Sequence, residues 1–391
     1  MGFGGAVVTG LGAILGTGAY VSIGLASGQW GDAVLVAIPI AGLVALCSGL
    51  SSAYLAGRFP VAGGTYEYAY QALGPSFGFG AGWLFLLAKT ASAASAALGL
   101  ALYLGLPGGR WLAILITLAL TALVAGGMRR TTVVNAALVA VTIAGLLVFI
   151  VPNVLEPGEV LLGIVDPAWL EGLLPAVAFL FVAYTGFGRI ATLGEEIESP
   201  AKIIPRAVVV TLGVAVLLYL GVAVAGSSLY GPQWGLLLES GATPADLVAP
   251  PLSTVVAIGA FTAMAGVLVN LVLGLSRVWL AMGRRGDMPR VLSRLDSRSQ
   301  PRSAVWLSGV AIAALCLVGD IGVTWSFAAF TVLLYYGITN LAVLALDRGR
   351  LTGWVGLLSC LFLSFYVGLT TWLVGTALLL VGVLWRRQRR A

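Results

Sequence analysis

Long apolar segments divide this chain of 391 residues and leave few polar residues to cover a surface facing water. Only 9% of its residues are charged, whereas an ordinary soluble domain carries about 25%. A helix needs about 20 apolar residues to cross the hydrocarbon core of a bilayer. The sequence therefore predicts an all-α polytopic membrane protein with about twelve transmembrane helices. The predicted spans are 3–28, 33–57, 76–105, 111–127, 132–152, 172–194, 204–229, 251–283, 303–319, 323–346, 353–367 and 369–385.

Lysine and arginine residues gather on one side when these segments are threaded alternately through a bilayer. With both termini in the cytoplasm, 18 of the 21 basic residues fall on the inner side, and the outer loops hold only Arg110. Because basic residues favour the cytoplasmic side, we predict the inner (cytoplasmic) membrane, with N- and C-termini in the cytoplasm. This topology accounts for the net charge of +6 without a nucleic-acid partner. The basic tail at 386–390 is expected to meet anionic lipid headgroups.

Two of the apolar segments are interrupted by closely spaced glycines. The first segment reads GLGAILGTG over 10–18, and the sixth reads AYTGFG over 183–188. Each glycine weakens a helix by about 1 kcal/mol relative to alanine. Glycines at such spacing can also serve close helix packing. Interrupted segments at matching positions of two halves are, however, the best sequence indication of a binding site in a transporter.

The interrupted segments begin two sets of five, about 170 residues apart. Because five is odd, the second set must run through the membrane in the opposite direction, which predicts an inverted repeat of five plus five helices. We expect the first repeat over 1–152 and the second over 172–346. Two further helices and the basic tail occupy 353–391.

An interrupted helix has a chemical consequence, since lipid cannot satisfy the backbone groups that it frees. The N-terminal end of a half-helix offers N–H groups and a positive dipole to a carboxylate. A C-terminal end and free carbonyls suit an ammonium group. The pair of interruptions is therefore expected to recognise both ends of an amino acid.

Several motifs resemble those of the amino acid–polyamine–organocation permeases. They are the glycine-rich stretch 12–18, FPVAGGTYEY at 59–68, GFGAGW at 78–83, YTGF at 184–187, EEIESP at 195–200, IPR at 204–206 and the stretch 276–289 ending in MGRRGDMP. The resemblance implies a leucine-transporter-like fold of five plus five helices with discontinuous helices 1 and 6. It implies no enzymatic activity and an amino acid substrate. The substrate-binding residues that it implies are Ile14, Gly16, Thr17, Gly18, Ala183, Tyr184, Gly186 and Phe187.

Within this set, the resemblance assigns a carboxylate contact to the backbone of Gly16, Thr17 and Gly18. It assigns an ammonium contact to the surroundings of Ala183, Tyr184 and Gly186. Phe187 is expected to form an aromatic lid over the site.

Four residues are candidates for coupling or gating. Some relatives carry a lysine in helix five where this chain has Thr142, which could instead be a sodium ligand or bond its own helix. Lys89 could replace that lysine in proton coupling, because a buried lysine releases its proton more readily, or could be a structural cation. Arg189 could bind an acidic substrate, gate the cytoplasmic path or pair with Glu195.

The predicted function is secondary active transport by alternating access, with cation-coupled uptake of a neutral amino acid. Exchange of amino acids or amines and uniport remain alternatives, as do a channel and a sensory permease relative from other classes. The chain has no histidine and no carboxylate at the centre of any span, which argues against a membrane enzyme. No metal site and no cofactor are expected, apart from a coupling H⁺ or Na⁺.

Overall fold

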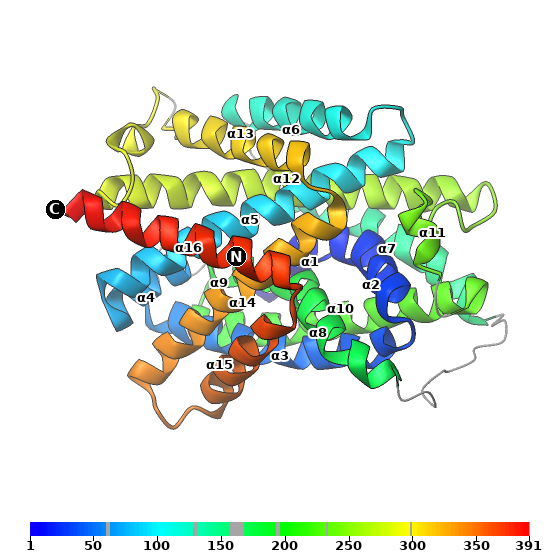
Figure 1. Ribbon diagram of the computed structural model, residues 1–391, viewed down its shortest axis with the longest axis horizontal. Helices are drawn as coiled ribbons and strands as arrows, with labels where there is room; N and C mark the ends of the chain where they lie inside the picture. Colours follow the sequence, from blue (N-terminus) through cyan, green and yellow to red (C-terminus); the bar gives the residue numbers. More distant parts are fainter. Residues whose placement is uncertain are drawn as a thin grey trace.

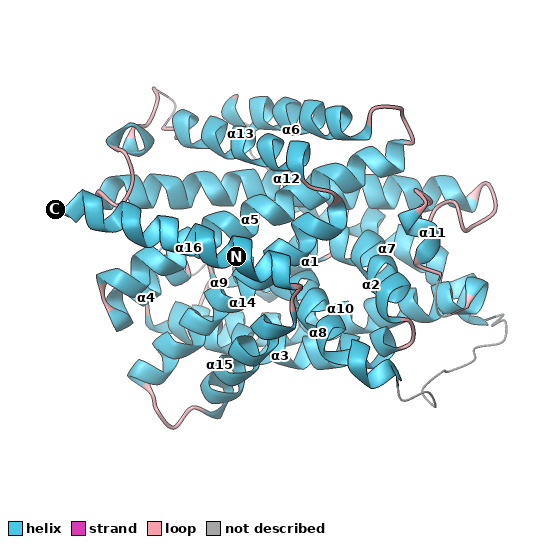
Figure 2. Cartoon of the chain, viewed as in Figure 1, coloured by secondary structure: helices cyan, strands magenta, loops and turns pink. Residues whose placement is uncertain are grey.

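The computed structural model describes residues 1–59, 63–127, 132–155, 168–192, 196–231, 234–297 and 299–390. All regular elements in these ranges are helices (Figure 2). This agrees with the all-α prediction and follows from the composition, because a helix satisfies its backbone hydrogen bonds within one apolar segment.

Within the described ranges, eight helical segments are long and apolar enough to cross a membrane. One bent pair of helices and three shorter apolar helices accompany them. Each of the twelve predicted spans contains one of these, and the number that cross the bilayer stays a prediction. The long helices are α3 (Ala33–Arg58), α5 (Pro75–Leu104), α7 (Thr132–Leu155), α8 (Ala168–Tyr184) with its continuation, α10 (Pro200–Tyr230), α12 (Leu252–Arg285), α14 (Ile321–Leu346) and α16 (Leu369–Arg390). The shorter ones are α6 (Gly109–Ala125), α13 (Arg302–Val318) and α15 (Leu351–Leu363) with η4 (Ser364–Tyr366).

The bent pair confirms the predicted interruption in the first segment. Helix α1 (Phe3–Ile14) ends in extended backbone at Leu15. The chain resumes as a π-helical turn, η1 (Gly18–Ser22), and continues as α2 (Ile23–Trp30). The two parts are bent by 43° relative to each other. The predicted break therefore lies at the glycines that were identified.

The sixth segment is also interrupted, but by a change of winding. Helix α8 tightens into a 3₁₀ turn, η2 (Thr185–Phe187), and resumes as α9 (Gly188–Ala191). The apolar run from Trp169 to Ala191 is thus one candidate span, and its hydrogen-bond pattern changes near its C-terminal end.

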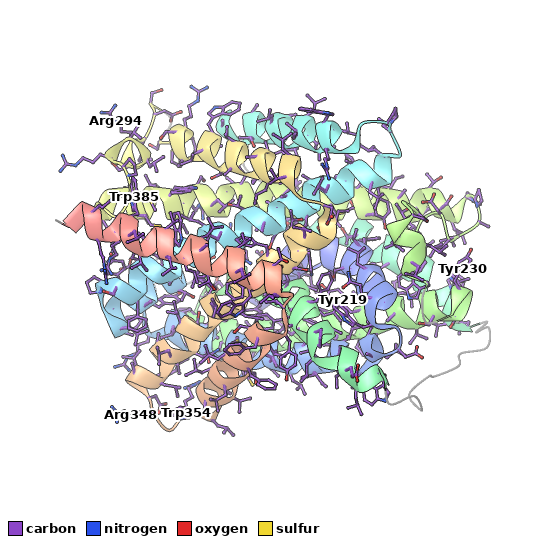
Figure 3. The ribbon with its side chains drawn as sticks, in the orientation of Figure 1. Tyr219, Tyr230, Arg294, Arg348, Trp354 and Trp385 are labelled. Carbon is purple, nitrogen blue, oxygen red and sulfur yellow. The ribbon has the colours of Figure 1, made fainter. Side chains whose placement is uncertain are left out.

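The interhelical contacts repeat between the two sets of segments when these are matched in order. In chain order, α1, α3, α5, α6 and α7 of the first set correspond to α8, α10, α12, α13 and α14 of the second. The contact between α1 and α10 therefore corresponds to that between α8 and α3. The contact between α7 and α12 corresponds to that between α14 and α5. Helix α5 contacts α6 as α12 contacts α13. Helices α5 and α14 are the most enclosed long helices, whereas α16 lies along the outside of the bundle (Figure 1). The interior is rich in small and aromatic side chains, and Tyr219 lies within it whereas Tyr230 lies at the periphery (Figure 3).

One element was not predicted, a short helix in the connection between α3 and α5. Helix α4 (Thr65–Leu73) is held against the end of α12 by polar contacts of Tyr66, Tyr70 and Glu67. Tyr70 Oη donates to Asp287 Oδ2 at 2.5 Å, and Arg285 forms an ion pair with Glu67. Burial, together with the hydrogen bond to Asp287, raises the pKa of Tyr70 to about 12. The phenol therefore stays protonated and keeps donating at physiological pH.

Candidate functional site

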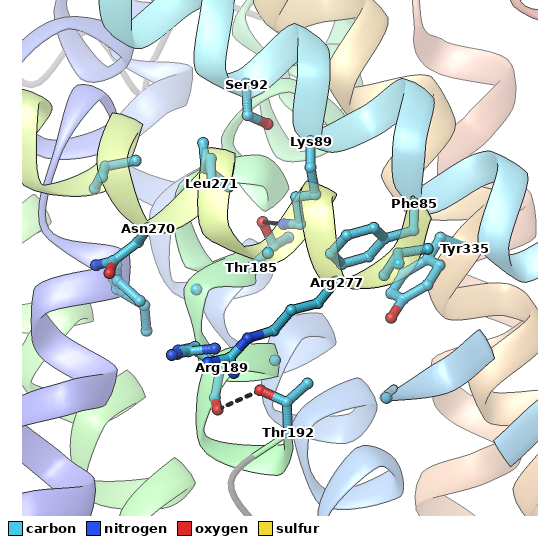
Figure 4. Close-up of a pocket in the computed structure, with 18 of the residues that line it drawn as sticks. Phe85, Lys89, Ser92, Thr185, Arg189, Thr192, Asn270, Leu271, Arg277 and Tyr335 are labelled. Carbon is cyan, nitrogen blue, oxygen red and sulfur yellow. Dashed lines mark hydrogen bonds between the residues drawn. The ribbon is translucent and has the colours of Figure 1, made fainter. Parts of the chain in front are cut away.

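A cavity of about 420 Å³ lies where the two interrupted helices meet. Its wall is formed by the end of α1 and the start of η1, by α5, by the α8–α9 interruption, and by α12 and α14. Figure 4 shows polar and charged side chains from these elements reaching into one space. The volume falls in the range of about 300–1,000 Å³ that is usual for small-molecule sites.

The two interruptions touch through their backbones. A Cβ atom added at Gly186 would lie 2.3 Å from the carbonyl oxygen of Ala13 and 2.6 Å from the amide nitrogen of Ile14. A Cβ atom at Gly18 would lie 2.8 Å from the Cβ of Ala183. These glycines therefore serve close packing as well as interrupting the helices, and the packing is between the two interruptions themselves.

Tyrosine hydroxyls lie against backbone carbonyls at both interruptions. Tyr219 Oη lies 3.1 Å from the carbonyl oxygen of Ile14 and 2.9 Å from that of Ala183. Tyr336 Oη donates to the carbonyl oxygen of Thr185 at 3.2 Å. The sequence argument expected a substrate to supply these partners, but the protein supplies them.

Two basic side chains from the predicted set face the cavity. Lys89 is buried on α5, and its Nζ donates to Thr185 Oγ1 at 3.2 Å, directly at the α8–α9 interruption. Arg189 follows on α9 and is half-buried. In Figure 4, the Arg277 side chain extends from α12 toward Arg189.

The structure brings most of the predicted substrate-binding residues together. The predicted residues that line the cavity are Ile14, Gly16, Thr17, Gly18, Lys89, Ala183, Gly186 and Arg189. Tyr184 is not in its wall, because the side chain turns away and its Oη donates to the carbonyl oxygen of Ile38. Phe187 is not in the wall either: it is fully buried, with its ring centroid 4.9 Å from that of Tyr336. In this conformation Phe187 does not cover the cavity, and the lid stays a prediction. Glu195 lies outside the described residues.

Thr142 lies away from the main cavity. It borders a separate space of about 10 Å³ between α1, α7 and α12, which is room for about one water molecule. Its hydroxyl donates to the carbonyl oxygen of Leu138 in its own helix at 2.9 Å, as threonines in membrane helices often do. Among the described residues, no cluster of three or more acidic or cysteine side chains could hold a metal ion.

Sequence reasoning missed the part of the wall that comes from α12 and α14. Asn270, Arg277 and Tyr336 all line the cavity. Arg277 carried a usable signal, since it is a charge inside an otherwise apolar segment, but the bias of basic residues toward the inner side already accounted for it. Nothing in the local sequence distinguishes Tyr336 from other aromatic residues of a buried helix.

A fully buried side-chain oxygen in the wall has no partner among the described residues. The hydroxyl of Thr17 is buried and makes no hydrogen bond there, although it lies between two glycines at the first interruption. A buried polar group without a partner costs about 1–3 kcal/mol. We expect a bound substrate to supply that partner.

The substitution Thr17→Val tests this expectation, because it removes the hydroxyl and keeps the shape. One hydrogen bond is worth about 0.5–1.5 kcal/mol net, so KM should rise about threefold to tenfold with an unchanged maximal rate. Thr17→Ser keeps the hydroxyl and should retain the KM of the original protein. Equal KM values for the valine and serine variants would contradict the assignment.

Comparison with known proteins gives consistent matches over nearly the whole chain. The profile of the amino acid permease family matches residues 5–385. An uncharacterized transporter of Mycobacterium tuberculosis is 38% identical over 390 residues, which cover 97% of this chain and 88% of that protein. The vacuolar cationic amino acid transporter 4 of Arabidopsis thaliana is 28% identical over 374 residues (87% of this chain, 62% of that protein). The branched-chain amino acid permease BcaP of Bacillus subtilis is 27% identical over 344 residues (78% and 72%).

Proposed function

Because the chain belongs to the amino acid permease family, we propose that it is a secondary active transporter that carries an amino acid across the cytoplasmic membrane by alternating access. Its homologues are transporters and not enzymes. The observation that carries the proposal is the cavity at the meeting point of the two interrupted helices. Binding sites of secondary transporters lie at such interruptions.

In the proposed binding mode, the substrate carboxylate meets the first turn after the α1 interruption. The residues Gly16, Thr17 and Gly18 line the cavity there, and the N–H groups at the start of a helix lack intrahelical partners. The positive end of the helix dipole adds to the attraction. The ammonium group would then face the carbonyls near Ala183 and Gly186 across the cavity.

Alternating access needs two halves that can move against each other, and we propose the inverted repeat as these halves. The first repeat would cover 1–152, the second 172–346, and the outer helices 353–391. The pairwise recurrence of the interhelical contacts supports this division. The Gly186 and Ile14 backbones would meet at the interface between the repeats.

The described conformation fits a state that is open toward the cytoplasm. The cavity reaches exposed residues at Glu196, Arg277 and Arg284. The distribution of basic residues predicts that all three lie on the inner side. We therefore propose that both termini are cytoplasmic and that substrate leaves past these residues.

For the driving force, we propose coupling to protons through Lys89, which contacts the α8–α9 interruption. A coupling sodium ion near Thr142, amino acid exchange and uniport are the competing mechanisms. With proton coupling, an imposed gradient of one pH unit drives about tenfold accumulation, the equivalent of about 1.4 kcal/mol. Lys89→Ala should abolish this accumulation.

Lys202→Ala is the matched control for Lys89→Ala, because Lys202 is an exposed lysine in the first turn of α10. The control should accumulate substrate as the original protein does. If Lys89→Ala still concentrates substrate under a pH gradient, proton coupling through this residue is excluded. Accumulation under a sodium gradient would then favour the site near Thr142.

The decisive experiment is reconstitution of the purified chain in liposomes, followed by counterflow measurements with radiolabelled amino acids. Saturable counterflow is the expected result. A flux that rises linearly with concentration and shows no counterflow would indicate a channel. The absence of flux from folded protein would overturn the proposed function or point to a partner-dependent sensory relative.

The charge of the substrate is a separate question. The relatives do not fix it, because one is named for cationic and another for branched-chain amino acids. The neutral substrate expected from the sequence stays a prediction, and the lining of the cavity bears on it directly.

A further inference from the structure

The charged side chains that line the cavity are mostly basic. Among the residues that the structure describes, they comprise one carboxylate, from Glu196, and four cations, from Lys89, Arg189, Arg277 and Arg284. None of the four cations forms an ion pair with a described residue. A concave site with low-dielectric walls focuses such a field and concentrates ligands of opposite charge. The cavity therefore favours a substrate with net negative charge.

The arrangement of the arginines sharpens this inference. Two like charges that face each other in a partly buried cavity repel, and a carboxylate between them removes the repulsion. Arg277 extends toward Arg189 from the opposite wall (Figure 4). Arg189 makes no hydrogen bond from its guanidinium to the described residues, whereas Lys89 already donates to Thr185. A guanidinium binds a carboxylate through two parallel hydrogen bonds.

The position of Arg189 suits the second carboxylate of an amino acid whose first carboxylate is bound at η1. Arg189 follows Gly186 by three residues, a rise of about 4.5–6 Å along the axis across the 3₁₀ turn and the start of α9. Gly186 itself packs on the backbone of Ala13 and Ile14 at the end of α1. The start of η1 and Arg189 thus line the same cavity on neighbouring parts of its wall.

We propose that the substrate is an acidic amino acid whose side-chain carboxylate is bound by Arg189 with Arg277 facing it. This inference rests on the proposed function, because it takes the α-carboxylate to lie at Gly16–Gly18. It replaces the neutral substrate that the sequence favoured. The acidic substrate is preferred over the neutral one because Arg277 lines the cavity, which the sequence did not reveal.

The test compares two nearly isosteric pairs, L-glutamate with L-glutamine and L-aspartate with L-asparagine, in proteoliposomes of the full chain. For at least one pair, the original protein should show a kcat/KM at least about tenfold higher for the acid than for the amide. Arg189→Gln should bring that ratio close to one, because the partner of the side-chain carboxylate is lost.

Arg294→Gln is the matched control, because Arg294 is exposed and lies at the edge of the molecule, away from the cavity (Figure 3). Its acid-to-amide ratio should equal that of the original protein. If Arg189→Gln does not fold, Arg277→Gln at the exposed mouth serves as the second variant and should lower the ratio severalfold. The acid-to-amide ratio of kcat/KM in the original protein tests the acidic substrate even without either variant.

The outcomes separate this inference from the proposed function. Preferred uptake of the amides or of other neutral amino acids would overturn the acidic substrate and leave the carrier function standing. An acid-to-amide ratio that Arg189→Gln and Arg277→Gln both leave unchanged would overturn the role of the arginines. If folded protein shows no counterflow with any amino acid, the proposed function fails and the inference fails with it.

Discussion

Replacement of Gly186 by alanine is expected to lower the transport rate by about 100-fold. The new Cβ would lie 2.3 Å from a backbone oxygen of α1, so the two interruptions would have to separate. Overpacking costs about 1–3 kcal/mol even where flexible side chains can yield, and backbone yields less. The cost falls on the contact between the proposed repeats, where transport requires a defined geometry. Counterflow measures the loss of transport, and thermal unfolding of the purified variant measures the loss of stability.

Gly213→Ala is the control for this prediction. Gly213 lies within α10, and a Cβ atom there would meet no other atom within 4 Å. Alanine favours a helix over glycine by about 1 kcal/mol, so this variant should transport normally and unfold at an equal or slightly higher temperature. Normal transport by Gly186→Ala would show that the contact between the interruptions is not needed for function.

Removal of the Tyr219 hydroxyl is expected to have the second large effect. Its oxygen contacts one freed carbonyl from each interruption, at Ile14 and at Ala183. Tyr219→Phe leaves both carbonyls without this partner in a fully buried place, and such groups cost about 1–3 kcal/mol. We expect a lower unfolding temperature and a transport rate reduced by about tenfold.

Tyr230→Phe is the matched control on the same helix. Tyr230 is 53% exposed at the far end of α10, so loss of its hydroxyl should change neither stability nor transport. If the Tyr219 hydroxyl stabilises the two interruptions, Tyr219→Phe must lose more stability and more transport than Tyr230→Phe. Similar behaviour of the two variants would mean that the freed carbonyls find other partners at no cost.

The helical architecture could be predicted from the sequence because the apolar segments are long and the charges between them are few. The interruption at Gly16–Gly18 was located to the residue, since closely spaced glycines weaken a helix whatever packs against it. Helix α4 was missed because its stability comes from contacts with Asp287 and Arg285, more than 200 positions away. Local patterns do not contain that information.

For the candidate site, the glycines and Lys89 were found, because each is unusual inside an apolar segment. The direction of the aromatic side chains could not be deduced. Tyr184 and Phe187 lie in the interrupted stretch but point away from the cavity, since their orientation depends on α3 and α14. Tyr336 enters the wall from α14 for the same reason. The basic character of the site depended on Arg277 and Arg284, which approach from another segment.

The pairing of α6 with α13 has a consequence for the surrounding lipid. These two helices pack against each other along one edge of the molecule (Figure 1). Each has 17 residues, a length of about 26 Å, compared with a hydrocarbon core of about 30 Å. If both helices cross the bilayer as predicted, the acyl chains beside them must compress, or Arg110 and Arg302 at the helix starts must reach up to the headgroups. The bilayer around this carrier would then be thinner on one side than on the other, and its elastic energy would vary with acyl-chain length.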